Sequence, residues 1–106
     1  MENVGAIITE SSRGLSTATA IRLAQDGFKI TVNYRRDEEG AEETVQMVKD
    51  HGGEAFAVKA DVTKPEDVDR MVRQTVENYG DLGVLVNNAG LSQHAAIDEL
   101  SHEDWQ

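Results

Sequence analysis

The chain has 106 residues, with 20 acidic and 10 basic side chains and a formal net charge of −10. It is therefore one small domain or part of a larger one, and the acidic surplus argues against nucleic acid or an anionic membrane as a partner. The lack of cysteine excludes disulfides and thiolate metal sites, and no apolar run approaches the roughly 20 residues that span a bilayer. We expect an acidic globular protein of the cytoplasm.

The first third of the chain predicts a strand, a helix and a second strand. Residues 4–8 are a short apolar run, typical of a buried strand. From Gly14 onward apolar residues recur with helical spacing, and Gly27 is placed to cap the helix end. The residues expected to face the sheet are Leu15, Ala18, Ile21, Leu23 and Ala24. Residues 28–33 are rich in β-branched side chains and predict the second strand.

The middle of the chain repeats this alternation. A helix is predicted with acidic residues 37–39 in its first turn, where the helix dipole favours negative charge, and residues 51–53 end it. Its apolar positions are Ala41, Val45 and Val48. Residues 54–60 predict the third strand.

A third helix begins at Thr63 or Lys64 with Pro65 in its first turn, and its apolar face carries Val68, Met71, Val72 and Val76. Residues 84–87 predict the fourth strand, and residues 101–104 have the pattern of a capped helix start. Strands that alternate with helices imply a parallel sheet with right-handed crossovers, so the predicted fold class is α/β.

Polar segments follow three of the predicted strands. Residues 9–16 follow the first strand, residues 60–63 (Ala-Asp-Val-Thr) the third, and residues 87–90 (Asn-Asn-Ala-Gly) the fourth. The carboxyl ends of parallel strands share one edge of the sheet, where ligands gather and a phosphate can sit on a helix N-terminus.

Together these segments resemble the short-chain dehydrogenase/reductase family, which carries Thr-Gly-x-x-x-Gly-x-Gly, Asp-Val and Asn-Asn-Ala-Gly after strands one, three and four. The matching residues are Thr9, Gly14, Asp61, Val62 and the tetrapeptide 87–90, and the similarity runs from about Val4 to Gln106. The Asn-Tyr-Arg segment after the second strand is similar to that of bacterial 3-oxoacyl-carrier-protein reductases and glucose dehydrogenases.

The resemblance implies a partial Rossmann-type doubly wound sheet with strand order 3-2-1-4 and an NAD(P) site. Ser11, Ser12 and Leu15 would line the pyrophosphate and adenosine ribose through their backbone groups. Asp61 would accept a hydrogen bond from the adenine amino group, with Val62 beside the ring. The segment Asn88, Ala89 and Gly90 would flank the ribose near the nicotinamide.

The choice of cofactor depends on the end of the second strand. A carboxylate there would bind the 2′-hydroxyl of NAD, but the first acidic residue is Asp37. Arg35 and Arg36 stand there instead, with Arg13 in the glycine-containing turn, and guanidinium groups suit a phosphate. We expect NADP, with NAD as the alternative; in the competing interpretation, Arg35 and Arg36 pair with acidic residues 37–39. The expected cofactor-binding residues are then Ser11, Ser12, Arg13, Gly14, Leu15, Arg35, Arg36, Asp61, Val62, Asn88, Ala89 and Gly90.

Two positions depart from the family pattern. Glu10 stands where the first glycine belongs and Ser16 where the third belongs. A carboxylate at about 4 Å from a pyrophosphate would cost roughly 1–4 kcal/mol, so we expect weakened cofactor binding. These departures leave an alternative open: a non-catalytic Rossmann-fold binding or regulatory module with a degraded dinucleotide site.

We expect no catalytic residue and no metal ligand in the chain. The family's acid/base Tyr, its Lys and its Ser lie beyond the fourth strand, after residue 106. Tyr34 and Tyr79 lack a Lys four residues later, where Glu38 and Gly83 stand. The chain is therefore predicted to be the amino-terminal part, residues 1–106, of a single NAD(P)-binding domain, and to be inactive alone. Its parent would be an NADP-preferring oxidoreductase acting on a small carbonyl or alcohol substrate.

Self-association is also expected. With order 3-2-1-4, the fourth strand is an edge, and the third helix alone covers one face of the sheet. Exposed apolar sheet favours association.

Overall fold

The computed structural model describes residues 4–9 and 13–86, with the Arg13 side chain outside that description. Within these residues the elements are β1 Gly5–Ile8, α1 Arg13–Gln25, β2 Lys29–Tyr34, α2 Glu38–Asp50, β3 Ala55–Lys59, α3 Pro65–Tyr79 and β4 Leu82–Val86. The strands form one parallel sheet in the order β3-β2-β1-β4. The predicted α/β class and strand order of a partial Rossmann-type sheet are confirmed.

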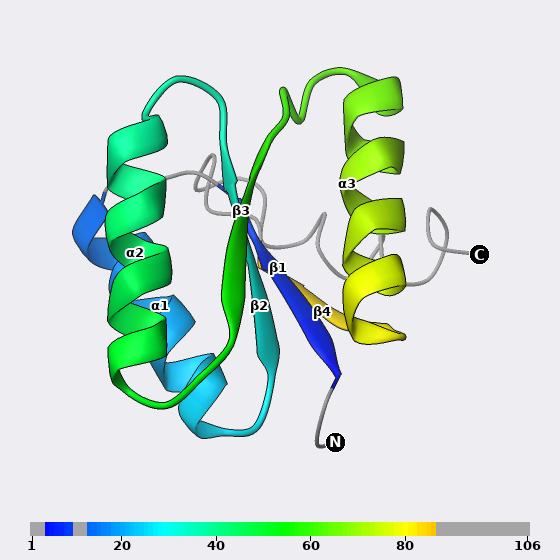
Figure 1. Cartoon of the computed structure of the whole chain (residues 1–106). Coiled ribbons are helices and arrows are strands. Elements are labelled where there is room, and N and C mark those ends of the chain that lie inside the picture. The colour runs from blue at the N-terminus through cyan, green and yellow to red at the C-terminus, as the bar shows by residue number, and fades with distance from the viewer. Residues whose placement is uncertain (1–3, 10–12, 87–106) are drawn as a thin grey trace.

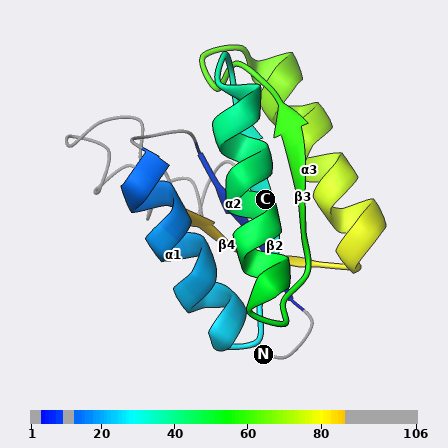
Figure 2. The ribbon, with the colours of Figure 1, turned by 60° about the vertical axis from the view of Figure 1, so that its left-hand side comes forward.

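The helices divide between the two faces of the sheet as expected (Figure 1). Helices α1 and α2 lie side by side on one face, and α3 lies on the other (Figure 2). The core under α1 and α2 is made of Ala6, Ile8, Ala20, Ile30, Val32, Ala41, Val45, Val48 and Ala55. The core under α3 is made of Ile7, Val58, Ala60 and Met71. Among the described residues, the core under α3 therefore has fewer buried side chains than the core under α1 and α2.

Local signals explain where α2 and α3 begin and end. The Asp37 carboxylate accepts a hydrogen bond of 3.0 Å from the Gly40 N–H and caps α2. Pro65 opens α3, and Gly80 ends it in the left-handed conformation, with φ of 86°. Within the described residues, no helix has both the length and the apolar character needed to cross a membrane.

Ile21, Leu23 and Ala24 of α1 pack against the core as predicted, but the first part of the helix differs from the prediction. Leu15 is 54% exposed and Ala18 is exposed, whereas Ser16 and Ala20 are buried. Small residues four positions apart let the helix backbone approach the sheet closely, and this close approach outweighs the apolar spacing read from Leu15. The Thr17 and Thr44 hydroxyls, 2.7 Å apart, join α1 to α2.

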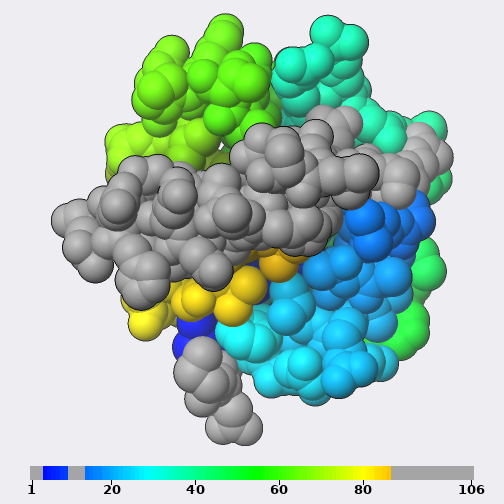
Figure 3. Space-filling view, turned by 180° about the vertical axis from the view of Figure 1, so that it is seen from behind, coloured from blue at the N-terminus to red at the C-terminus, as the bar shows by residue number. Residues whose placement is uncertain are grey.

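Strand β4 begins two residues earlier than predicted, at Leu82, and its predicted last residue, Asn87, lies outside the described residues. The Gly5 N–H bonds the Asp81 carbonyl at 3.1 Å, which starts the pairing of β1 with β4 before Val84. Seen from behind, β4 (yellow to orange) reaches the surface beside α1 (Figure 3). In the described part of the chain β4 pairs with β1 alone and is an edge of the sheet.

Candidate functional site

A pocket of about 310 Å³ opens at the carboxyl ends of β2 and β3. It is lined by Asn33, Arg35, Arg36, Ala60, Asp61, Val62 and Thr63. Four of the predicted site residues, Arg35, Arg36, Asp61 and Val62, therefore line one pocket, although they come from two separate segments of the chain. The topology explains this, because β2 and β3 are adjacent and parallel.

Hydrogen bonds between the two strand ends fix the floor of the pocket. The Ala60 N–H donates to the Tyr34 carbonyl at 2.9 Å, which extends the pairing of β2 with β3. The Asn33 side-chain amide is buried and donates to the Ala60 carbonyl at 3.0 Å. The segments that carry the arginines and Asp61 are thus held in a fixed relation.

Asp61 is held in its ionised form by its own turn. Its Oδ1 accepts from the Thr63 N–H at 3.0 Å and from the Thr63 hydroxyl at 2.6 Å. These bonds lower the pKa of Asp61 below its ordinary value, and the positive charges of Arg35 and Lys64 add to the effect. An ionised carboxylate only accepts hydrogen bonds, and with both bonds on Oδ1, Oδ2 is the oxygen suited to accept from a ligand.

The first carboxylates after β2 serve other structural purposes. Asp37 caps α2 through Gly40, as described above. Glu38 hydrogen-bonds the Tyr34 hydroxyl, and burial, followed by the charges of Glu38 and Glu42, raises the pKa of Tyr34. The segment from Lys29 to Arg36 itself contains no acidic residue, so the end of β2 presents guanidinium groups and an amide to the pocket.

This donor set fits a phosphorylated adenosine. Two guanidinium groups supply the positive charge and planar donors that phosphate prefers. An ionised carboxylate can accept from an exocyclic amino group, and Val62 adds an apolar surface for a ring. Among the described residues, no group of three or more His, Asp or Glu is arranged to hold a metal ion.

The remaining predicted site residues are either in the first turn of α1 or outside the described residues. Ser11, Ser12, Asn88, Ala89 and Gly90 fall outside the described residues, as do Glu10 and the Arg13 side chain. Gly14 and Leu15 are exposed in the first turn of α1. A Cβ added to Gly14 would meet no described atom within 4 Å outside its own helix.

Neither tyrosine has the lowered pKa that a base at neutral pH needs. The Tyr79 hydroxyl donates to the Ile30 carbonyl at 2.8 Å. Burial, followed by the charge of Glu54, raises the pKa of Tyr79, and that of Tyr34 is raised as well. Both hydroxyls stay protonated and serve the fold.

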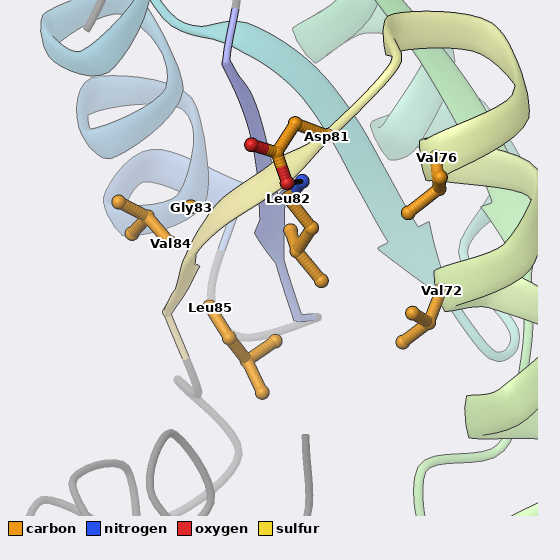
Figure 4. A pocket seen from close by; sticks show the side chains of 7 residues that line it. All are labelled: Val72, Val76, Asp81, Leu82, Gly83, Val84 and Leu85. Carbon is orange, nitrogen blue, oxygen red and sulfur yellow. Dashed lines mark hydrogen bonds between the residues drawn. The ribbon is translucent and has the colours of Figure 1, made fainter. Parts of the chain in front are cut away.

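A second pocket, of about 280 Å³, lies between α3 and β4 (Figure 4). Its lining residues are Val72, Val76, Asp81, Leu82, Gly83, Val84 and Leu85. Leu82 and Leu85 lie on the side of α3, whereas Val84 packs on the opposite side of the sheet. We call this pocket the α3/β4 groove; apart from Asp81, its lining carries no ionisable side chain.

The sequence does not predict two residues that hold the backbone of the polar pocket. Asn33 lines the pocket, whereas Asp67 does not line it but bonds its backbone from α3. Asp67 accepts a hydrogen bond of 2.8 Å from the Asp61 N–H. No local pattern signals either contact, because the partners lie 27 and 6 residues away along the chain.

Comparisons with known proteins identify the family. A family model described as short chain dehydrogenase matches residues 5–106. The chain is 41% identical over 102 residues to glucose 1-dehydrogenase 2 of Bacillus subtilis, covering 95% of this chain and 40% of that protein. It is 41% identical over 95 residues to the short-chain dehydrogenase/reductase homolog YusS of Bacillus subtilis, covering 90% of this chain and 87% of that protein.

Solved structures indicate the same family. A short-chain dehydrogenase/reductase from Serratia marcescens superposes with a TM-score of 0.77 at 32% identity, over 95% of this chain and 43% of that one. The chain thus spans about two fifths of the length of the glucose dehydrogenase and of the Serratia enzyme. The comparisons do not favour the alternative of a non-catalytic module. They show that the chain belongs to the short-chain dehydrogenase/reductase family that its motifs predicted.

Proposed function

We propose that this chain carries the adenosine- and phosphate-binding part of an NADP-preferring short-chain dehydrogenase/reductase. The observation that carries the proposal is the polar pocket, in which Arg35, Arg36 and Asp61 converge at the carboxyl ends of β2 and β3. When bound, the dinucleotide would supply the redox chemistry: its reduced form would donate a hydride to a carbonyl carbon, and its oxidised form would accept one from an alcohol carbon. The residues of this chain bind and orient it.

Each side chain of the pocket has a role in this proposal. Asp61, ionised and held by Thr63, accepts from the adenine amino group, and Val62 lies against the ring. Arg35 and Arg36 bind the 2′-phosphate of the adenosine ribose. Ser11, Ser12, Arg13, Gly14 and Leu15 bind the pyrophosphate and ribose, and Asn88, Ala89 and Gly90 flank the second ribose.

The preference for NADP has an electrostatic cause. NAD is favoured by a carboxylate that accepts from the 2′-hydroxyl and repels a 2′-phosphate. Here Asp37 is the first acidic residue after β2, and it caps α2 through Gly40. The two arginines beside it offer the phosphate charge-assisted hydrogen bonds instead.

We further propose that the 106-residue chain binds the cofactor without turning over substrate. Its two tyrosines have raised pKa values, and their hydroxyls bond Glu38 and the Ile30 carbonyl. The proton transfer that accompanies hydride transfer then depends on residues of a longer parent. In this proposal, the 106-residue chain and those further residues belong to a single NAD(P)-binding domain.

Titration of the chain with NADPH and NADH, followed by cofactor fluorescence, tests the proposal. We expect tighter binding of NADPH, and a loss of about 10- to 100-fold for NADPH in the double variant Arg35→Ser, Arg36→Ser, as hydrogen bonds to charged groups predict. NADH affinity should change little. Arg22→Ser, which removes an exposed arginine paired with Asp26 at 3.4 Å on α1, is the control. Equal affinity for both cofactors, or an equal loss for both in the variant, would overturn the preference.

A further inference from the structure

One peptide unit at the polar pocket is held at both of its polar ends by side chains. The peptide between Ala60 and Asp61 has its carbonyl bonded by the Asn33 amide at 3.0 Å. Its N–H donates to Oδ2 of Asp67 at 2.8 Å. The two side chains come from different elements, since Asn33 belongs to β2 and Asp67 to the first turn of α3.

Both side chains are themselves held in place. Asn33 is 3% exposed, and its amide also lies 3.5 Å from the Val58 carbonyl. Oδ1 of Asp67 lies 3.8 Å from the Arg70 guanidinium, which also donates to the Lys59 carbonyl. The two ends of the peptide are thus tied to the sheet and to α3.

A peptide unit is planar, so it rotates as one body. Bonds at both its carbonyl and its N–H fix ψ of residue 60 and φ of residue 61 together. The φ of Asp61 sets the direction in which its side chain leaves the backbone. The neighbouring groups are fixed too, because the Ala60 N–H bonds the Tyr34 carbonyl and the Asp61 carbonyl accepts from the Lys64 N–H, each at 2.9 Å.

We propose that Asn33 and Asp67 are positioning residues that act through Asp61: they fix the 60–61 peptide so that the Asp61 carboxylate is already aimed at the adenine amino group. This inference rests on the proposed nucleotide site and adds the residues that organise it. A group ordered before binding loses less entropy on binding, so the gain is in affinity for the adenosine moiety.

The variants Asp67→Asn and Asp67→Ala separate the hydrogen bond from the charge. Both remove the same negative charge, but the asparagine oxygen can still accept from the Asp61 N–H and the alanine cannot. Asp69→Asn and Asp69→Ala are matched controls on the same helix, where Asp69 bonds the Arg73 guanidinium at 2.7 Å. NADPH affinity is measured by titration at a temperature where circular dichroism shows each variant folded, and the exchange rate of the Asp61 amide proton is measured by NMR.

We expect Asp67→Ala to bind NADPH about three- to tenfold more weakly than Asp67→Asn, and to exchange the Asp61 amide faster. The two Asp69 variants should match one another in both measurements. Adding Asn33→Ala to Asp67→Ala should weaken binding by less than the product of the separate losses, because either change releases the same peptide unit.

The outcomes distinguish this inference from the proposed function. A wild-type chain that binds no NADPH overturns the proposed function, and the positioning role is then wrong as well. A wild-type chain that binds NADPH, with equal affinities for Asp67→Ala and Asp67→Asn, overturns the positioning role alone. Independent losses for Asn33→Ala and Asp67→Ala would show that the two residues do not act on one peptide unit, which also overturns it.

Discussion

The polar pocket and the α3/β4 groove have similar sizes, about 310 and 280 Å³, but opposite linings. The polar pocket is framed by two arginines, an ionised aspartate and a buried amide, and hydrogen bonds from side chains of β2 and α3 hold its backbone. The groove is lined mainly by valine and leucine from α3 and from the edge strand β4.

Volume therefore does not distinguish the two pockets as candidate binding sites. Polar groups that converge and are held in place do, because they can recognise a ligand through specific hydrogen bonds. The groove instead marks the side of the sheet where, among the described residues, fewer side chains are buried. Changes near the groove should therefore alter stability and leave nucleotide binding by the folded chain intact, while changes in the polar pocket should do the reverse.

The substitution expected to lower the free energy of unfolding most is on the α3 side of the core. Met71 is 1% exposed between α3 and the sheet. Met71→Ala should lower the free energy of unfolding by about 2–5 kcal/mol, because it removes buried apolar volume and leaves a cavity. Urea unfolding measures this loss. Met47→Ala, at a methionine on α2 that is 43% exposed, should change stability by less than about 0.5 kcal/mol.

A similar loss for Met47→Ala and Met71→Ala would show that α3 does not pack on the sheet as described. NADPH affinity of Met71→Ala, measured where the variant is fully folded, should equal that of the wild type. A large loss of NADPH affinity would show that the α3 side of the core and the polar pocket are not independent of each other.

A smaller loss of stability is expected from a substitution at the start of β1. A Cβ added to Gly5 would lie 2.6 Å from the Asp81 carbonyl oxygen and 3.0 Å from Thr75 Cγ2. Gly5→Ala should lower the free energy of unfolding by about 1–3 kcal/mol, because the backbone before β4 must move. Gly14→Ala serves as the control for stability, since a Cβ there meets no described atom within 4 Å outside its own helix. Equal stabilities of the two variants would contradict the close approach of β1 to Asp81.

The smallest loss of stability is expected when the Tyr79 hydroxyl is removed. Tyr79→Phe removes the bond to the Ile30 carbonyl and should lower the free energy of unfolding by about 0.5–1.5 kcal/mol at neutral pH. Burial raises the pKa of Tyr79 above its ordinary 10.0, so the folded state favours the neutral phenol. That contribution is complete below pH 10.0 and is lost as the pH rises above it.

Unfolding measured at about pH 8 and about pH 10.5 checks the sign of this dependence. The wild type should lose more stability than Tyr79→Phe over this interval, and Tyr34, present in both proteins, cancels in the comparison. Parallel losses would mean that Tyr79 does not titrate with a raised pKa in the folded protein.

Much of the fold could be predicted from local signals. Acidic residues at 37–39, Pro65 and Gly27 mark helix ends, and the buried positions Ala41, Val45 and Val48 of α2 follow helical spacing. On α1, Ile21, Leu23 and Ala24 could be predicted to pack on the core, but the burial of Ser16 and Ala20 could not, because it depends on close packing rather than on hydrophobicity. The start of β4 depends on the bond between Gly5 and Asp81, which joins distant parts of the chain.

The candidate site likewise has residues that could be predicted from the sequence and residues that could not. Arg35, Arg36, Asp61 and Val62 could be predicted because they stand at motif positions directly after strands, and the topology brings those strand ends together. Asn33 and Asp67 could not, because their contacts with the 60–61 peptide depend on the alignment of β2 and α3 in three dimensions. The roles of the predicted residues in cofactor binding remain predictions.

The most direct test of the account is an NMR titration of the ¹⁵N-labelled chain with NADPH. The account predicts saturable shifts of the backbone amides at Asn33 to Arg36 and at Ala60 to Thr63, with the amides of Val72, Val76 and Leu82 to Leu85 unchanged. Shifts confined to the α3/β4 groove, or no saturable shift at all, would contradict the claim that the polar pocket binds the dinucleotide.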